Sequence, residues 1–256
     1  MDKKIIKNRK NQKIVVTIEE IQNQKGLVFV MHGLGGFKEQ DHIRTFANTF
    51  KENSYTVVMF DTTNTIGESD GQYENATVTN YYEDLEDVIN WAETQSWYKE
   101  PFCLTGHSLG GFCIAYYAEN YPQKIKAIAP ISALISGKLS LKAHSKEEID
   151  NWKRTGWKIQ ESKSKPGLIK KLKWSHMEDR MKYDLLRKAD MLTMPVLIIV
   201  GELDDSIPPN HQQLLYDKLS SKKEFYIIKG APHTFRDKQH LNEVKKIFKK
   251  WIATLN

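Results

Sequence analysis

One serine in this chain stands in a pattern that could supply a nucleophile for acyl transfer. Residues 106–110 read Gly-His-Ser-Leu-Gly, with Ser108 at the centre. An apolar run, 102–105, precedes the pattern, and a helix-prone stretch, 109–120, follows it. In this context the serine lies on a sharp turn between a strand and a helix, so that its hydroxyl projects from the carboxyl edge of a sheet. We therefore predict that Ser108 is the nucleophile.

A serine hydroxyl needs an adjacent base, which a third group must orient. Residues 201–208 follow an apolar run directly, which places their carboxylates at the same sheet edge as the serine. Asp204 and Asp205 both qualify as the orienting acid. Asp204 is favoured because it fits the spacing Gly-x-x-Asp-x-x-Ile-Pro in this segment. His233 is the histidine that comes just after the last predicted strand, and we expect it to be the base.

Two backbone N–H groups must face the oxyanion that forms during such a reaction. Leu109, the residue after the serine, is expected to supply one of them. The glycine-rich loop 32–36, His-Gly-Leu-Gly-Gly, is expected to supply the other from Leu34, because its glycines let the backbone approach a substrate closely. The loop lacks the Gly-Lys-Ser/Thr of a phosphate-binding loop and has no dinucleotide fingerprint.

Short β-branched runs separated by helical patterns must position these residues. Such runs are typical of strands buried on both faces of a parallel sheet. An alternating segment, 13–20, predicts an earlier antiparallel strand, and Asn80 is expected to cap a helix. We predict an α/β fold with a mostly parallel central sheet flanked by helices. The buried strands are expected at residues 27–31, 56–60, 102–105, 125–129 and 196–200, and a last strand is expected at 225–228.

The alternation of strands and helices stops between residues 133 and 193, where no strand is predicted. This interval is expected to be helical. It holds 15 Lys and Arg against 8 Asp and Glu, a net charge of +7, whereas the rest of the chain has 23 against 24. We predict a core formed by 1–132 and 194–256, with 133–193 inserted as a cap, or lid, that forms the substrate pocket. Three of the six tryptophans lie in the cap and would suit either an aromatic acyl group or simple core packing: Trp152, Trp157 and Trp174.

Composition sets aside several classes of protein. With 256 residues, 40% hydrophobic and 27% charged, the chain is ordinary for a globular protein. Its apolar runs are too short to span a bilayer, and its basic N-terminus lacks the apolar region of a signal peptide, so we expect a cytoplasmic protein without stable membrane insertion.

Cys103 and Cys113 are expected to be buried, with no metal site and no cofactor. The basic segment carries no nucleic-acid motif, so the expected partner is a small-molecule ester. Five histidines are expected at the surface: His42, His144, His176, His211 and His240.

Taken together, these motifs resemble the α/β-hydrolase superfamily over about residues 27–132 and 194–256. Residues 73–80 are similar to the feruloyl and cinnamoyl esterase branch, and monoacylglycerol-lipase-like and serine-aminopeptidase-like hydrolases share the same motifs. The resemblance implies a serine carboxylesterase that cleaves small acyl esters through an acyl-enzyme, with aromatic (cinnamoyl or feruloyl) esters among the candidate substrates. It also implies a cap over the serine. Lipase, thioesterase and peptidase activities use the same three residues, and a non-catalytic module that binds a small molecule is a further alternative.

One loop departs from the pattern of this family. The family usually has Asp-x-x-Gly-x-Gly-x-Ser after the second parallel strand. Here residues 61–69 are one residue longer and lack the first glycine. The departure bears on the shape of the substrate pocket rather than on the three catalytic candidates.

Overall fold

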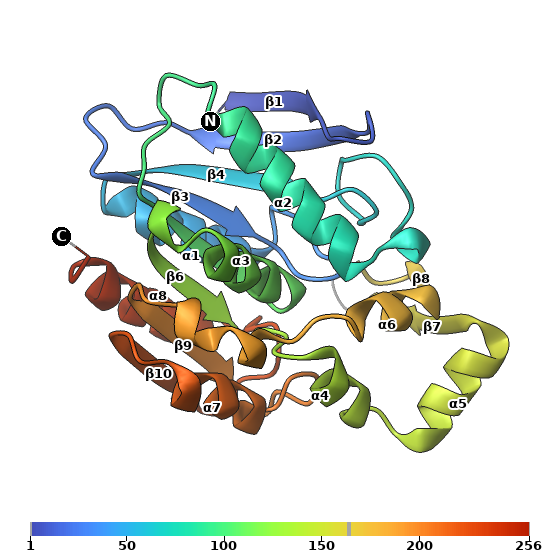
Figure 1. Cartoon of the computed structure of the whole chain (residues 1–256). Helices are drawn as coiled ribbons and strands as arrows, with labels where there is room; N and C mark the ends of the chain where they lie inside the picture. Colours follow the sequence, from blue (N-terminus) through green and yellow to red (C-terminus); the bar gives the residue numbers. More distant parts are fainter. Residues whose placement is uncertain (1, 163–164, 256) are drawn as a thin grey trace.

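The computed structural model describes residues 2–162 and 165–255, and an eight-stranded sheet forms its centre (Figure 1). The strands lie in the order β1-β2-β4-β3-β5-β6-β9-β10. β1 and β2 pair antiparallel and β2 joins β4 antiparallel, whereas the pairings from β4 to β10 are parallel. The predicted mostly parallel sheet is confirmed. Its strands are β1 (Asp2–Lys7), β2 (Lys13–Glu19), β3 (Gly26–Met31), β4 (Tyr55–Asp61), β5 (Phe102–His107), β6 (Ile125–Ile131), β9 (Val196–Gly201) and β10 (Lys223–Ile228).

Helices cover both faces of the sheet. α1 (Asp41–Glu52) and α8 (Lys238–Ile252) pack together on one face. α2 (Val78–Ala92), α3 (Leu109–Asn120) and α7 (Pro209–Lys218) cover the other. Both layers bury apolar side chains against central strands, of which β3, β4, β5 and β9 are buried along their whole length, and this explains their continuous apolar runs. Short 3-10 turns, η1 (Tyr73–Asn75) and η2 (Pro122–Lys124), precede α2 and β6.

The predicted cap on α2 is wrong. Thr77 is the N-cap, and its hydroxyl accepts from the backbone N–H of Asn80. The side chain of Asn80 instead donates to Asp84 and Thr63 in a buried polar network. Both threonine and asparagine are good N-cap residues. The cap is Thr77 because an N-cap residue has a non-helical backbone, and Thr77 is extended at φ −135°, whereas Asn80 lies within the helix.

The inserted segment 133–193 contains a β-hairpin, so the prediction that it is wholly helical is wrong. β7 (Trp157–Glu161) and β8 (Ile169–Lys173) pair antiparallel, and Gly167, two residues before β8, has a φ of +83°. The sequence of β8 has no apolar alternation that would signal a strand: three of its five residues are lysines, Ile169 is exposed, and only Leu172 is buried. The other elements are α4 (Gly137–Lys142), α5 (Lys146–Thr155), α6 (Ser175–Arg180), η3 (Leu185–Arg187) and η4 (Ala189–Met191).

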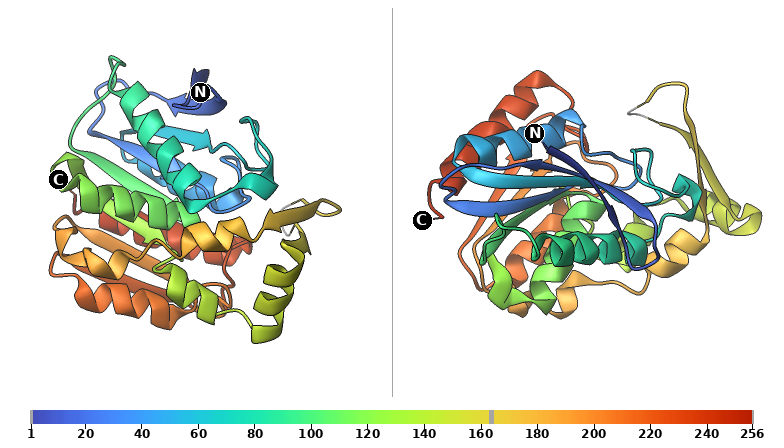
Figure 2. Two further views of the ribbon diagram at one scale, coloured as in Figure 1. Left: turned by 45° about the vertical axis from the view of Figure 1, so that its right-hand side comes forward. Right: turned by 90° about the horizontal axis from the view of Figure 1, so that it is seen from above.

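This segment lies at the carboxyl edge of the sheet, toward which the central arrows point, and α5 and the hairpin project from the body (Figures 1 and 2). Trp152 is buried there against Trp174 at 5.6 Å between ring centroids, and its indole N–H donates to Leu172. Core packing therefore accounts for Trp152. No helix in the described part of the chain is long and apolar enough to cross a membrane.

Two of the histidines expected at the surface are buried. His42 lies on α1 with its ring 4.5 Å from that of His107, and His176 lies on α6 with no exposed area. A lone histidine in a sequence carries no sign of which helix face it occupies, which is why both were misplaced. Cys103 and Cys113 are buried as expected, and burial raises the pKa of the Cys103 thiol to about 12.

Candidate active site

Ser108 lies on the turn between β5 and α3 in strained backbone geometry. Its φ of 56° and ψ of −117° fall outside the regions that a residue with a side chain normally adopts. The neighbouring glycines allow the turn to close. A Cβ on Gly106 would lie 2.6 Å from the backbone of Gly110, and one on Gly110 would lie 2.4 Å from the carbonyl oxygen of His32. The hydroxyl is thereby held at the end of the strand, where it can meet groups from other loops.

The structure brings Ser108, His233 and Asp204 together from three loops. The Nε2 atom of His233 lies 3.0 Å from the hydroxyl of Ser108, and its Nδ1 atom lies 2.8 Å from Oδ2 of Asp204. A carboxylate can only accept, so Nδ1 carries the imidazole proton and Nε2 is left to accept from the serine. This is the arrangement of a nucleophile, a base and an orienting acid.

Asp204 is buried and held ionised by its partners. Burial alone would raise its pKa, but hydrogen bonding and charge attraction from His233, helped by the backbone N–H of Ile207, hold the pKa below its usual range. Its second oxygen, Oδ1, accepts from the N–H groups of Ile207 at 2.8 Å and Ser206 at 3.1 Å. Asp205 is exposed, and its carboxylate accepts from the hydroxyl of Ser206. Of the two candidates, Asp204 is the one that contacts the histidine.

The loop after β3 carries Leu34 close to the serine. A Cβ on Gly33 would lie 3.0 Å from the Cβ of Ser108, so a side chain at residue 33 would crowd the nucleophile. The next N–H, of Gly35, donates to the hydroxyl of Tyr81. The N–H groups of Leu34 and Leu109 have no acceptor among residues 2–162 and 165–255, and Leu109 is the first residue of α3, where an N–H has no partner within the helix. Both donors are thus available to a ligand.

A buried ion pair ties this loop to the segment that departs from the family pattern. Asp61, fully buried, accepts from the backbone N–H and the Nζ of Lys38, both at 2.8 Å, and from the N–H of Glu68. Burial opposes the charge on Lys38, but the adjacent carboxylates of Asp61, Glu39 and Glu68 outweigh it and raise its pKa. The glycine that this segment retains is required, because a Cβ on Gly67 would lie 2.3 Å from the carboxyl carbon of Asp61. The sequence did not indicate the role of Lys38.

The side chain of His107 contacts the backbone of the loop that carries His233. Its Nε2 lies 2.7 Å from the carbonyl oxygen of His233, and the two rings are 4.6 Å apart. Burial, together with the nearby imidazole of His233, lowers the pKa of His107 to about 3. The ring is therefore neutral, and its single proton must be on Nε2, since a carbonyl only accepts. Its place inside the Gly-x-Ser-x-Gly pattern was the one sequence signal for this contact.

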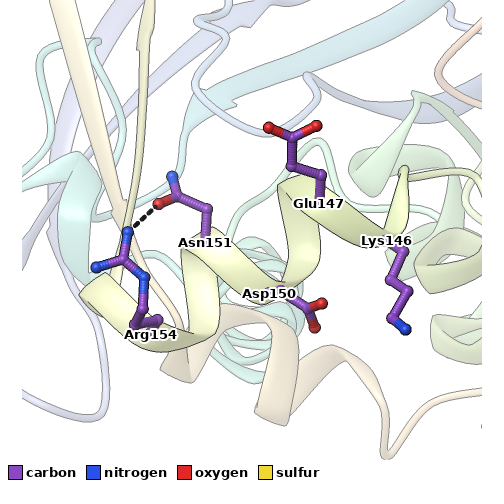
Figure 3. Close-up of a pocket in the computed structure, with 5 residues that line it drawn as sticks. All are labelled: Lys146, Glu147, Asp150, Asn151 and Arg154. Carbon is purple, nitrogen blue, oxygen red and sulfur yellow. Dashed lines mark hydrogen bonds between the residues drawn. The ribbon is translucent and has the colours of Figure 1, made fainter.

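Hollows lie beside the hairpin and along α5. One, of about 520 Å³, lies between residues 65–74 and the hairpin and is lined by Tyr73, Lys170 and Ile169, among others. A Cβ on Gly35 would lie 2.6 Å from the ring of Tyr73, so this hollow adjoins the loop that carries Leu34. The other, of about 630 Å³, runs along α5 alone (Figure 3), where Arg154 donates to Asn151. It is lined by residues of one helix and contains none of the catalytic candidates.

Comparisons with known proteins identify the family of the chain and its relatives. The family model described as "Serine aminopeptidase, S33" matches residues 22–239. A protein of Escherichia coli, "Uncharacterized 31.7 kDa protein in traX-finO intergenic region", is 27% identical over 239 residues, or 81% of this chain and 82% of that protein. The mitochondrial palmitoyl-protein thioesterase ABHD10 of Bos taurus is 24% identical over 178 residues, which cover 68% of this chain and 56% of that protein. The solved structure of Est1E from Butyrivibrio proteoclasticus with ferulic acid bound has a TM-score of 0.84 at 20% identity and covers 98% of each chain, a likeness of fold.

Proposed function

The chain belongs to the serine aminopeptidase family of α/β-hydrolases, and from this premise we propose that it is a carboxylic ester hydrolase with Ser108, His233 and Asp204 as its catalytic triad. The observation that carries the proposal is the unbroken hydrogen-bond chain from hydroxyl to imidazole to buried carboxylate, at 3.0 and 2.8 Å. Such a chain raises the nucleophilicity of a serine that is otherwise a poor nucleophile.

The reaction has two steps. In the first, Oγ of Ser108 attacks the ester carbonyl while its proton passes to Nε2 of His233. The N–H groups of Leu34 and Leu109 donate to the oxyanion, and Asp204 stabilises the imidazolium. His233 then gives the proton to the departing alcohol. In the second step His233 takes a proton from water, which attacks the acyl-enzyme, and the acid leaves as Ser108 regains its proton.

The covering segment 133–193 is proposed as the cap that selects the substrate. The hollow of about 520 Å³ beside Tyr73 is proposed to receive small acyl esters. An aromatic acyl group such as a hydroxycinnamate is supported by the fold likeness to Est1E, whose structure contains ferulic acid. Trp152 is not part of this argument because it packs inside the cap, whereas Trp157 and Trp174 are only partly buried.

Thioester hydrolysis is the second candidate, and the similarity to the palmitoyl-protein thioesterases favours it. The same triad cleaves oxygen esters and thioesters, so the two functions differ in the pocket. Parallel assays with 4-nitrophenyl butyrate, methyl ferulate and palmitoyl thioesters of graded acyl length would rank them. A kcat/KM at least tenfold higher for long-chain thioesters than for butyrate would replace the esterase proposal with the thioesterase one.

The decisive test is Ser108→Ala. We expect it to lower the hydrolysis of 4-nitrophenyl butyrate by several orders of magnitude and to abolish labelling by a fluorophosphonate probe. Cys113→Ala, a buried neighbour on α3, serves as the matched control and should leave labelling intact. Wild-type rates in the Ser108 variant would rule out Ser108 as the nucleophile. A wild-type chain that neither hydrolyses the ester nor labels would favour a binding module without catalysis.

A further inference from the structure

Two buried side chains hold the loop that carries Leu34. His32, just after β3, and Tyr81, on α2, have no exposed area, and their rings meet edge to face with 5.8 Å between the centroids. Neither belongs to the proposed triad. Both nevertheless form hydrogen bonds with the backbone of residues 33–35. These contacts bear on the direction of the Leu34 N–H.

The hydrogen bonds of His32 determine which ring nitrogen carries its proton. The backbone N–H of Thr62 donates to Nε2 at 3.1 Å, so Nε2 must accept. Burial lowers the pKa of His32, so the ring is neutral at neutral pH and carries its single proton on Nδ1. Nδ1 lies 2.8 Å from the carbonyl oxygen of Gly33 and donates to it. The same oxygen accepts from the N–H of Gly36 at 2.9 Å, so two donors hold this carbonyl.

Holding the carbonyl of Gly33 also sets the direction of the Leu34 N–H. The two groups belong to one peptide unit, which is planar and trans, so they point in opposite directions. This unit borders the nucleophile, because a Cβ on Gly33 would lie 3.0 Å from the Cβ of Ser108. The N–H therefore cannot turn to another direction unless the unit gives up both hydrogen bonds to its carbonyl.

Tyr81 holds the next peptide unit of the loop. Its hydroxyl accepts from the N–H of Gly35 at 3.1 Å. Residues 33–36 form a turn with Gly35 at φ +61°, and the common turn types differ in how their middle peptide unit is oriented. The hydroxyl of Tyr81 selects the orientation in which the Gly35 N–H faces it. The loop is thus fixed at two successive peptide units.

The second donor of the proposed oxyanion hole is held without side chains. The carbonyl oxygen of Ser108, in the same peptide unit as the N–H of Leu109, accepts from the N–H groups of Phe112 and Leu134, both at 3.1 Å. Backbone contacts therefore fix this donor, whereas the donor on the glycine-rich loop depends on buried side chains. A side-chain substitution beneath that loop can weaken one donor and leave the other in place.

We propose that His32 and Tyr81 are positioning residues of the oxyanion hole, which fix the N–H of Leu34 toward the carbonyl oxygen of the substrate. They act through the backbone of the loop and do not touch the reacting atoms. A donor whose direction is already set needs no reorganisation when the oxyanion forms, and this is the source of its effect on the rate. The proposal rests on the function proposed above and adds two residues to its machinery.

Two substitutions at residue 32 separate its two hydrogen bonds. The amide NH₂ of asparagine can lie where Nδ1 lies and donate to Gly33, whereas the amide oxygen of glutamine can lie where Nε2 lies and accept from Thr62. We expect His32→Gln to lower kcat for 4-nitrophenyl butyrate about 10- to 100-fold with KM little changed, because a misdirected donor costs up to what a missing donor costs. His32→Asn should retain most of the wild-type kcat.

Tyr81→Phe leaves the N–H of Gly35 without its acceptor and should lower kcat about 3- to 10-fold. Tyr55→Phe is the matched control, because it removes a buried phenol at the start of β4, whereas the site lies at the carboxyl edge of the sheet. This control should behave as the wild type. Rates are referred to the concentration of active sites, titrated with the fluorophosphonate probe, so that a loss of folded protein does not count as a loss of kcat.

Propyl trifluoromethyl ketone reports on the oxyanion hole separately from turnover. Oγ of Ser108 adds to its carbonyl carbon, His233 takes the serine proton, and the ketone oxygen becomes the oxyanion of a hemiketal. Fluorine NMR follows the ionisation of this oxygen with pH. We expect His32→Gln to lower the acid dissociation constant of the hemiketal hydroxyl about tenfold or more, since a weakened donor stabilises the oxyanion less. His32→Asn should leave it close to the wild-type value.

The pair of variants at residue 32 decides between a positioning and a structural role. A loss of kcat in His32→Asn as large as that in His32→Gln would overturn the proposal, as would a dissociation constant of the hemiketal that is the same in His32→Gln and the wild type. Wild-type kcat in Tyr81→Phe would remove Tyr81 from it. A wild-type chain that neither hydrolyses the ester nor forms the hemiketal would count against the proposed function instead.

Discussion

Replacing Asp204 by asparagine tests the proposed triad at the carboxylate, because both of its oxygens accept hydrogen bonds. One oxygen of the carboxylate accepts from His233, and the other accepts from the N–H groups of Ile207 and Ser206. An amide has one oxygen and one NH₂ group. If the oxygen stays with the two backbone donors, the NH₂ faces Nδ1 of His233. Nδ1 must then accept, and the imidazole proton moves to Nε2, where it blocks the transfer from Ser108.

The expected loss in kcat is about 10³- to 10⁴-fold, or about 4–5.5 kcal/mol in activation free energy, since each tenfold corresponds to about 1.4 kcal/mol. The reverse orientation of the amide would leave two backbone donors facing NH₂, at a cost of about 1–3 kcal/mol for each unsatisfied group. The variant therefore has no low-energy arrangement that preserves the base. Its fold should persist, because the amide keeps the size of the carboxylate and the backbone contacts.

The assay is hydrolysis of 4-nitrophenyl butyrate together with the rate of fluorophosphonate labelling, with thermal unfolding as the measure of folding. Asp205→Asn is the matched control: its side chain is exposed and contacts Ser206 rather than the histidine, so its activity should stay within twofold. An Asp204→Asn variant that retained more than a tenth of wild-type kcat would refute the reasoning. An equal loss in Asp205→Asn would return the assignment to the alternative that the sequence left open.

Two further predictions concern buried groups near the site and in the core. His107→Phe removes the donor to the carbonyl of His233 and should lower kcat about tenfold with KM little changed. His107→Gln, which keeps an N–H donor, should recover part of the loss in the same kinetic assay. An unaltered kcat in the Phe variant would dismiss this positioning role. Burial raises the pKa of Glu119 from 4.5 to about 8, so the folded chain binds the extra proton and stability falls as pH rises between these values. Glu119→Gln should thus raise the thermal midpoint by roughly 5 °C at pH 8.5 and hardly at pH 4.5, and an equal shift at both pH values would contradict the assigned cause.

The elbow and the core strands could be predicted because their signals are local. A parallel strand buried on both faces requires a continuous apolar run, and the turn at Ser108 requires glycines two residues to either side. The choice between Asp204 and Asp205 is less local. The sequence spacing favours Asp204. The physical reason for the choice is that Asp204 is buried beside His233, and only the three-dimensional fold shows this. The same holds for the location of His42 and His176 in the interior.

The arrangement of the inserted segment 133–193 could not be predicted from local pattern, because it depends on contacts between residues far apart in the chain. Asp179 accepts from the backbone N–H and the hydroxyl of Thr79, and His176 binds the carbonyl of Ala76, so α6 is held by the start of α2 rather than by its own sequence. No periodicity encodes such pairings. The consequence is functional: the segment proposed to select the substrate is the part that local pattern could not reveal, whereas the turn at Ser108 is strained in place by a few adjacent residues.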